Sequence, residues 1–254
     1  MALGVLNTIA QELQLVNAKI GKYFQVRSGY LGEFAHLELD RTDQVLRPAC
    51  VLSVAGHFKC KGSQAVAMAA IIQLIFLADR IHSAVPEDEE PGKSEITDPR
   101  DSSQLPVLVG DYLYGRFFTT LSEEDILEYL EPLARMICVI NEGGIQRSKA
   151  VHQGDHSQQS LVRIIEKESG LFMAESCRIS ASMGGATPDQ EKLLWDFGFN
   201  LGMAYGVMRE PDCHELSAEY VARARAALGG LEEDIFVNQL VSLVDNLAPD
   251  TVQT

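Results

Sequence analysis

The stretch from Ala70 to Glu87 reads AIIQLIFLADRIHSAVPE, and it decides the fold more than any other part of the chain. Its first half is almost entirely apolar, and its apolar residues keep a helical pattern up to His82. Ser83 and Ala84 follow, and Pro86 cannot continue a helix because it has no backbone N–H donor. We therefore predict one long helix over about residues 63–85. The apolar residues leading up to His82 include Ile72, Leu74, Ile75 and Ala78.

Helical periodicity recurs in nearly every other segment. Pro48 is well placed at the first turn of a second helix, and Thr187 with Gln190 forms a capping-box start for a later one. Further helices are predicted over residues 107–120, 158–183, 217–228 and 231–247. The first helix of the chain is indicated by an apolar stripe at alternating spacings of three and four, formed by Leu6, Ile9, Leu13, Val16 and Ile20.

The fold class follows from these periods. No run shows the strict alternation of a half-buried strand over more than a few residues. We predict an all-α helical bundle of about eight or nine helices that forms a single domain over residues 1–254. Residues 86–106 carry four prolines and clustered acids, so we expect an exposed acidic loop there.

Composition and charge exclude several classes of partner. The chain has 254 residues, of which 46% are hydrophobic and 22% charged, as in an ordinary globular protein. The formal net charge of −15 repels nucleic acid and anionic lipid at long range, so we expect no nucleic-acid partner.

The cysteines and the N-terminal segment suggest a cellular location. The five cysteines are an odd number, widely spaced, and show neither a C-x-x-C pair nor zinc-site spacing, which favours a reduced, cytoplasmic protein. No basic segment precedes an apolar run at the N-terminus, and no window approaches the roughly 18 uninterrupted apolar residues of a membrane span. We therefore expect no transmembrane segment.

The helix over Ala70 to Glu87 resembles the one that, in trans-prenyl diphosphate synthases, ends in His-Asp-Asp-x-x-Asp and holds magnesium against an allylic diphosphate. In this chain His82 is kept, Ser83 and Ala84 replace the carboxylate pair, and Glu87 stands at the last acidic position.

Further blocks resemble the same family, in the same order. Residues 42–48 (TDQVLRP) keep only the final Arg47-Pro48 of the family's Gly-Gly-Lys-Arg-x-Arg-Pro, and residues 108–113 (LVGDYL) resemble its Ala-Gly-Asp-Tyr-Leu. Residues 142–146 (EGGIQ) resemble its Glu-Gly-x-x-x-Gln turn, and residues 165–172 (IEKESGLF) keep Lys167 of its Lys-Thr block. Residues 197–208 lead to Arg209-Glu210-Pro211-Asp212-Cys213, where the family has a second Asp-Asp-x-x-Asp.

The resemblance implies the isoprenoid synthase fold together with a degenerate active site. It carries over no catalytic residue and no metal ligand, because Ser83, Ala84 and Arg209 stand where both magnesium-binding motifs had carboxylates. Four residues are left as vestigial substrate-binding candidates: Arg47, His82, Lys167 and Arg209. Arg209 with Arg47 and Lys167 could form a metal-free diphosphate site, although an arginine beside Glu210 and Asp212 is more often a surface ion pair.

For function, the resemblance favours a catalytically silent or regulatory subunit that pairs with an active prenyl diphosphate synthase. Two alternatives stay open. One is an active prenyltransferase that condenses an allylic diphosphate with isopentenyl diphosphate through divergent ligands such as Glu87, Glu210 and Asp212. The other is a stand-alone protein that binds an isoprenoid or another apolar ligand in the helical cavity.

Partners and cofactors differ between these alternatives. The first implies a heterodimer with a catalytic subunit, and a homodimer is the other assembly considered, with an isoprenoid diphosphate as a possible ligand in either. No cofactor is expected, and magnesium enters only with the divergent enzyme. The apolar stripe of the first helix is the surface that the sequence suggests for a partner helix.

Overall fold

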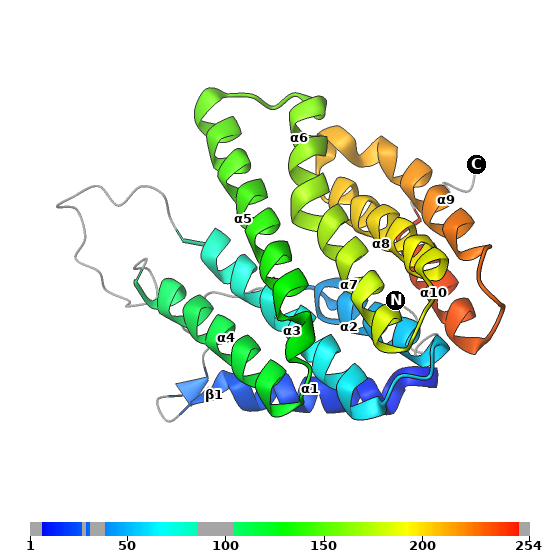
Figure 1. Cartoon of the computed structure of the whole chain (residues 1–254). Coiled ribbons are helices and arrows are strands. Elements are labelled where there is room, and N and C mark those ends of the chain that lie inside the picture. The colour runs from blue at the N-terminus through cyan, green and yellow to red at the C-terminus, as the bar shows by residue number, and fades with distance from the viewer. Residues whose placement is uncertain (1–6, 27–28, 31–38, 86–103, 249–254) are drawn as a thin grey trace.

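The computed structural model describes residues 7–26, 29–30, 39–85 and 104–248, and these residues are almost entirely helical. Figure 1 shows α5 and α6 side by side, α8 and α9 packed along the other flank, and α1 crossing below them. The ten α-helices among the described residues are α1 (Ala10–Phe24), α2 (Arg41–His57), α3 (Gly62–Ser83), α4 (Gln104–Glu123), α5 (Leu130–Gln153), α6 (Gln158–Ile165), α7 (Leu171–Met183), α8 (Pro188–Met208), α9 (Ser217–Leu228) and α10 (Ile235–Asp245).

Short elements connect these helices. The two-residue strands β1 (Gln25–Val26) and β2 (Gly29–Tyr30) pair antiparallel directly after α1. Two 3₁₀ turns, Leu127–Tyr129 and Pro211–Leu216, precede α5 and α9. A π-helical turn, Glu166–Gly170, joins α6 to α7 without a break, so the predicted long helix over residues 158–183 is continuous but locally wider.

Helix α3 is the centre of the fold. Every residue from Ala65 to Ala78 is buried, so this part of the helix has no solvent face, and α1, α2, α4, α5 and α7 all contact it. The helix is long and apolar enough to cross a membrane, but 83% of that apolar window is buried inside the protein, as in the core helix of a globular fold. Its predicted bounds, about 63–85, agree with Gly62–Ser83 to within two residues.

Three expectations from the sequence are wrong in detail. Helix α2 begins at Arg41, about two turns before Pro48, because Asp40 and Asp43 form a capping box that starts it early. Residues 142–146 are not a turn, since they lie inside α5. The apolar stripe of the first helix is not an open surface for a partner, because Ile9, Leu13 and Val16 are buried in the core and Ile20 is partly buried against it.

Other expectations hold. Thr187 and Gln190 form the predicted capping box at the start of α8, and α9 has the predicted bounds. The expected loop over residues 86–106 falls mostly outside the described residues, and the expectation is wrong for its last three residues, because they begin α4. The five cysteines are free thiols, as expected, with Cys50 and Cys177 in buried contact at an Sγ–Sγ distance of 3.3 Å.

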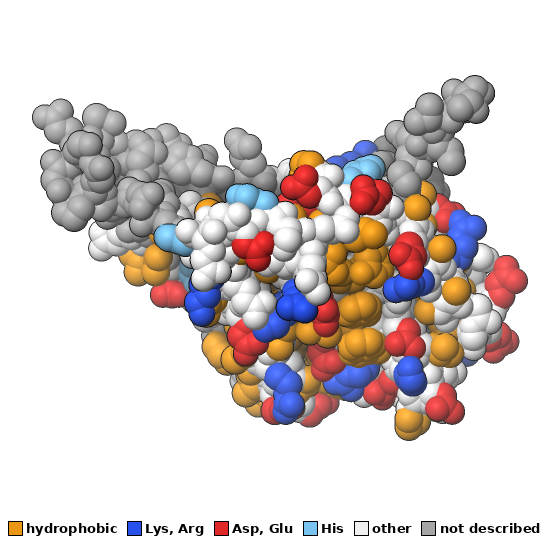
Figure 2. Space-filling view, turned by 90° about the horizontal axis from the view of Figure 1, so that it is seen from above, with side chains coloured by type: hydrophobic (Ala, Val, Ile, Leu, Met, Phe, Trp, Pro, Cys, Tyr) orange, Lys and Arg blue, Asp and Glu red, His pale blue; other side chains and the backbone are white. Residues whose placement is uncertain are grey.

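Charged residues of both signs are spread over the face seen from above in Figure 2, with a band of hydrophobic side chains running through its middle.

Beneath the surface, α8 approaches the π-helical turn closely. A Cβ atom added at Gly202 would lie 2.2 Å from the backbone oxygen of Ser169, and one at Gly198 would lie 2.4 Å from that of Met173. Glycine at these positions therefore allows the two helices to pack backbone against backbone.

This contact gives a stability prediction. We expect Gly202→Ala to lower the free energy of unfolding by about 1–3 kcal/mol, because the added methyl group must push α8 away from the π-helical turn. As a control, Gly115→Ala lies in the middle of α4 with no heavy atom within 4 Å of the new Cβ, and should raise stability by about 0.5–1 kcal/mol. Urea denaturation measures both, and equal effects would contradict the close approach.

Candidate functional site

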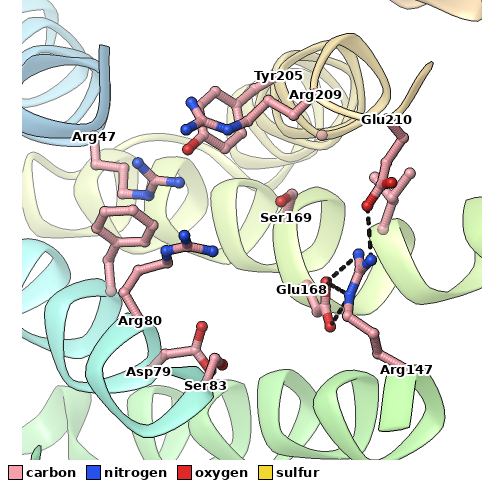
Figure 3. A pocket seen from close by; sticks show the side chains of 13 residues that line it. Arg47, Asp79, Arg80, Ser83, Arg147, Glu168, Ser169, Tyr205, Arg209 and Glu210 are labelled. Carbon is pink, nitrogen blue, oxygen red and sulfur yellow. Dashed lines mark hydrogen bonds and ion pairs between the residues drawn. The ribbon is translucent and has the colours of Figure 1, made fainter. Parts of the chain in front are cut away.

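A polar cavity lies where the C-terminal ends of α3 and α8 meet α2, α5 and the π-helical turn (Figure 3). Its volume is about 410 Å³. Four arginines line it, each from a different part of the chain: Arg47, Arg80, Arg147 and Arg209. Three acids also line it: Asp79, Glu168 and Glu210. A second hollow of about 760 Å³ adjoins it and shares Asp79, Ser83, Arg147 and Glu168 with it.

Helix α3 reaches the cavity with its last turns. The helix is buried as far as Ala78, and its polar residues begin where it leaves the core. Asp79, Arg80 and Ser83 all line the cavity, since residues three or four apart lie on one face of a helix. Phe76, one turn earlier, forms an apolar part of the wall.

Arg147 on α5 holds two of the three acids. Its Nε and Nη2 atoms donate to both carboxylate oxygens of Glu168, at 2.8–3.1 Å, and its Nη1 donates to Glu210 Oε1 at 2.6 Å. Burial would lower the pKa of Arg147, but the two carboxylates raise it above its ordinary value. Arg147 and its two acids therefore join α5, the π-helical turn and the segment after α8 at one point (Figure 3).

Arg209 holds two acids from the opposite side of the cavity. Its Nη1 donates to Asp40 Oδ2 at 2.9 Å, and its Nη2 donates to Asp43 Oδ2 at 3.2 Å. The same two carboxylates cap α2, so Arg209 ties the end of α8 to the beginning of α2. The hydroxyl of Tyr205 also donates to Asp43. The expected ion pair of Arg209 with Glu210 or Asp212 is not formed.

Arg47 is buried among aromatic rings. Only 2% of its surface is exposed, and its guanidinium lies 3.4 Å from the ring centre of Phe76 and 4.7 Å from that of Tyr205. Its Nε and Nη1 atoms have no hydrogen-bond partner in the described part of the chain. Cation–π contacts offset part of the cost of burying this charge, but they do not satisfy its N–H donors.

Asp79 is the one acid of the cavity without an arginine clamp. Burial raises its pKa to about 6, and the charge of Glu168 adds to the rise, while Arg80, Arg47 and Arg147 oppose it. Among the described residues it makes no ion pair of its own. Its charged form therefore costs folding free energy at neutral pH.

The structure brings together only some of the residues predicted from the sequence. Arg47 and Arg209 both line the cavity, whereas His82 lines the adjoining hollow, 3.4 Å from Asp111 on α4. Lys167 lines neither space, because its Nζ pairs with Glu142 Oε2 at 2.9 Å on the flank of α5. A diphosphate site made of Arg47, Arg209 and Lys167 is therefore not assembled. Glu87 lies outside the described residues.

Sequence reasoning missed Asp79, Arg80 and Arg147. The helical period gave a signal for the first two, since Asp79 stands four residues and Arg80 three residues before Ser83. For Arg147 the signal lay in the spacing of the motif. In Glu-Gly-x-x-x-Gln the glutamine stands five positions after the glutamate, so the residue of this chain at that position is Arg147 and not Gln146.

The residues around the cavity do not suit a magnesium site. Magnesium needs several oxygen ligands in octahedral geometry, and no group of three or more His, Cys, Asp or Glu side chains among the described residues could hold a metal ion. Glu168 and Glu210 are taken up by Arg147. A guanidinium about 4 Å from a divalent ion would add repulsion of about 4 kcal/mol per unit charge at an effective dielectric of about 20.

Known proteins match most of this chain. The family model described as polyprenyl synthetase matches residues 30–209. Octaprenyl diphosphate synthase of Escherichia coli is 25% identical over 197 residues, which is 77% of this chain and 61% of that protein. Heptaprenyl diphosphate synthase component 2 of Geobacillus stearothermophilus is 27% identical over 202 residues, covering 78% and 62%. The matched region thus spans about three fifths of the length of these relatives.

Solved structures share the fold over nearly the whole chain. The geranyl diphosphate synthase small subunit from Antirrhinum majus superimposes with a TM-score of 0.73, at 15% identity, and covers 96% of this chain and 100% of the other. At this level of identity the likeness establishes the all-helical fold.

The raised pKa of Asp79 predicts that the stability of the protein depends on pH. Because the pKa of Asp79 rises from 3.8 to about 6 on folding, its ionisation opposes folding above pH 6, and this effect disappears below the unfolded pKa. We expect Asp79→Asn to be more stable than the natural protein by about 2–3 kcal/mol at pH 7.5, with the difference vanishing near pH 4.

Urea denaturation at a series of pH values measures this difference. Asp196→Asn removes a carboxylate on the exposed side of α8, where it pairs with Lys192, and serves as the matched control. If the stability difference between Asp79→Asn and the natural protein stays the same from pH 4 to pH 7.5, the pKa of the Asp79 carboxyl is not raised by folding.

Proposed function

Because this chain belongs to the polyprenyl synthetase family, we propose that it is a catalytically silent or regulatory subunit that pairs with an active prenyl diphosphate synthase. The observation that carries the proposal is the pairing of acids with arginines around the cavity. Arg147 holds Glu168 and Glu210, and Arg209 holds Asp40 and Asp43.

These ion pairs leave the cavity without the ligands that metal-dependent ionisation of a diphosphate needs. Bound cations promote departure of the diphosphate by neutralising the charge that develops on it. Here Ser83 and Ala84 carry no charge, and Arg209 carries a positive one on the other side of the cavity. The divergent-enzyme alternative would need Glu210 as a ligand, and Glu210 is already bound by Arg147.

The stand-alone binding protein is also less well supported. Most side chains that line the cavity are charged or polar, and the largest apolar ones are Phe76 and Ile165. Arg47 stacks on Phe76, so a charged group covers that apolar ring. Such a cavity suits an anionic ligand better than an isoprenoid tail.

The names of related proteins support an assembly of unlike chains. One relative is the second component of a heptaprenyl diphosphate synthase, and one structural neighbour is the small subunit of a geranyl diphosphate synthase. We propose the same kind of assembly for this chain, in the cytoplasm, without a cofactor of its own.

The outer face of α4 is the surface that we assign to this partner. Among the described helices α4 packs mainly against α3, and its other side carries large apolar residues in the open. Leu108 is 55% exposed, Tyr112 37% and Phe118 52%. Leu108 and Tyr112 lie one turn apart, and Phe118 lies further along the half of α4 that is opposite its buried residues. A helix of this length, about 30 Å, offers several exposed apolar side chains to a partner subunit of the same family.

Co-expression tests the proposed function. We expect this chain alone to give no turnover of an allylic diphosphate with isopentenyl diphosphate and magnesium. Co-expressed with an active prenyl diphosphate synthase from the same genome, it should co-purify and change the rate or the product length of that enzyme. Turnover by the chain alone, or failure both to co-purify and to change the partner's products, would refute the proposal.

A substitution on α4 tests the assigned surface. We expect Phe118→Glu to weaken the complex at least about 30-fold. The substitution removes an aromatic anchor, which contributes about 2 kcal/mol or more to binding, and places a charge in the apolar contact. Ile235→Glu is the control, since Ile235 is 63% exposed at the start of α10, on another part of the surface. Analytical ultracentrifugation gives both affinities. Equal weakening by the two variants would place the interface elsewhere.

A further inference from the structure

A groove at the other end of α3 has no part in the proposed function. It lies between α1, the beginning of α3 and the second half of α4, and its volume of about 620 Å³ is within the range of small-molecule sites. Ser63 lines this groove and Asp79 lines the polar cavity, so about 24 Å of helix separates the two spaces. The groove is therefore a separate feature of the fold.

Contacts between α1 and α4 fix the walls of this groove. The hydroxyl of Tyr23 on α1 is hydrogen-bonded to that of Thr120 on α4, at an oxygen–oxygen distance of 2.9 Å. Lys19, one turn earlier on α1, forms an ion pair with Glu124 just after α4. Tyr23 and Val66 of α3 are 6% and 8% exposed, so both belong to the core as well as to the groove. The groove is thus built on packed elements.

Apolar side chains form much of the lining. Leu15 and Ala18 lie one turn apart on α1, and the ring of Tyr23 and the side chain of Val66 continue the apolar wall. Leu15 is 58% exposed, although an apolar chain laid against it would remove its surface from water. These residues favour a ligand that has an apolar part.

Arg116 adds an unsatisfied charged group to the same groove. Its guanidinium carbon lies 4.1 Å from the ring centre of Tyr23, and its Nε atom is buried without a hydrogen-bond partner among the described residues. It forms no ion pair in the part of the chain that the structure describes. The aromatic ring stabilises the flat face of the guanidinium, but the N–H donors on its edge still need an acceptor.

The charges that line the groove favour an anion as that acceptor. Lys19 and Glu124 neutralise each other, whereas Lys22 forms no ion pair with any described residue. The guanidinium and Lys22 then stand against a single exposed acid, Glu123. Lys61 gives α3 no side-chain cap, so the positive end of this helix adds to the same potential. In a chain of net charge −15, such a positive spot is a local exception.

We propose that this groove binds an organic anion that carries an apolar chain. Its carboxylate or phosphate head contacts Arg116 and Lys22, and its chain lies along Leu15 and Val66. A guanidinium fork binds two oxygens of such a head at once, and the head supplies the acceptor that the buried Nε lacks. The site needs neither the loss of the metal motifs nor a second subunit, so it is independent of the proposed function.

Isothermal titration of the full-length chain with decanoate tests the site, and decanol serves as the uncharged ligand of the same chain length. We expect the natural protein to bind decanoate more tightly than decanol. Arg116→Gln should weaken decanoate binding at least about tenfold and leave decanol binding unchanged, because only the charged head uses the guanidinium. Arg135→Gln removes an exposed arginine of α5 that pairs with Glu131, and should bind both ligands like the natural protein.

A second variant keeps the test independent of the fold. Lys22 is exposed, so Lys22→Gln leaves the core intact, and it should weaken decanoate binding about threefold. Thermal melts without ligand check both variants. A preference between decanoate and decyl phosphate identifies the head group as carboxylate or phosphate.

Three outcomes would overturn the site. They are the absence of decanoate binding, equal affinity for decanoate and decanol, and equal effects of Arg116→Gln and Arg135→Gln. If Arg116→Gln does not fold, unchanged decanoate affinity in Lys22→Gln overturns it instead.

Discussion

The close approach of α8 to the π-helical turn is the contact on which the cavity depends. Gly198, Gly202 and Gly206 recur every fourth residue on one side of α8, and a Cβ atom at each would lie 2.2–2.4 Å from an atom of the segment Ile165–Met173. With any larger residue the two helices would have to move apart. The wall that carries Glu168 and Ser169 would then recede from the one that carries Tyr205, Arg209 and Glu210, and Arg147 could not bridge them.

Two arginines of the cavity are balanced in the same way. Arg147 and Arg209, which replace residues of the family's motifs, are each matched by acids from other elements, so that their charges are balanced across helices and not along one. Arg209 is balanced by Asp40 and Asp43 at the start of α2, and Arg147 by Glu168 and Glu210. In these pairs the acids around the cavity are neutralised by cationic side chains of the chain itself.

Much of the fold could be predicted from the sequence, because the signals that position helices are local. The periodicity of residues 70–82 and the capping box at Thr187 each lie within a few turns of chain, and both predictions agree with the structure. The start of α2 was misplaced because the proline at position 48 was given more weight than the capping pair Asp40 and Asp43. The burial of the first helix's stripe could not be predicted, since a stripe shows which face is apolar and not what covers it.

The site was harder to predict because its contacts join residues far apart in the chain. Arg47 was found through the motif that it keeps and Arg209 through the motif that it interrupts, but their surroundings depend on how α2 and α8 pack in the fold. That Arg209 would pair with Asp40 and Asp43, 169 and 166 residues away, has no local signal. Lys167 is the one residue kept from its motif, yet its side chain does not reach the cavity and pairs instead with Glu142 on the flank of α5.

The ion pairs of Arg147 with Glu168 and Glu210 also constrain which substitutions this chain can accept. Replacement of Arg147 alone leaves Glu168 and Glu210 as adjacent carboxylates without a counter-ion, and loss of either acid leaves the half-buried arginine under-compensated. A change at any one of these three positions is therefore unfavourable unless the others change with it. The three side chains form one unit, and substitutions that the fold tolerates must be correlated across α5, the π-helical turn and the segment after α8.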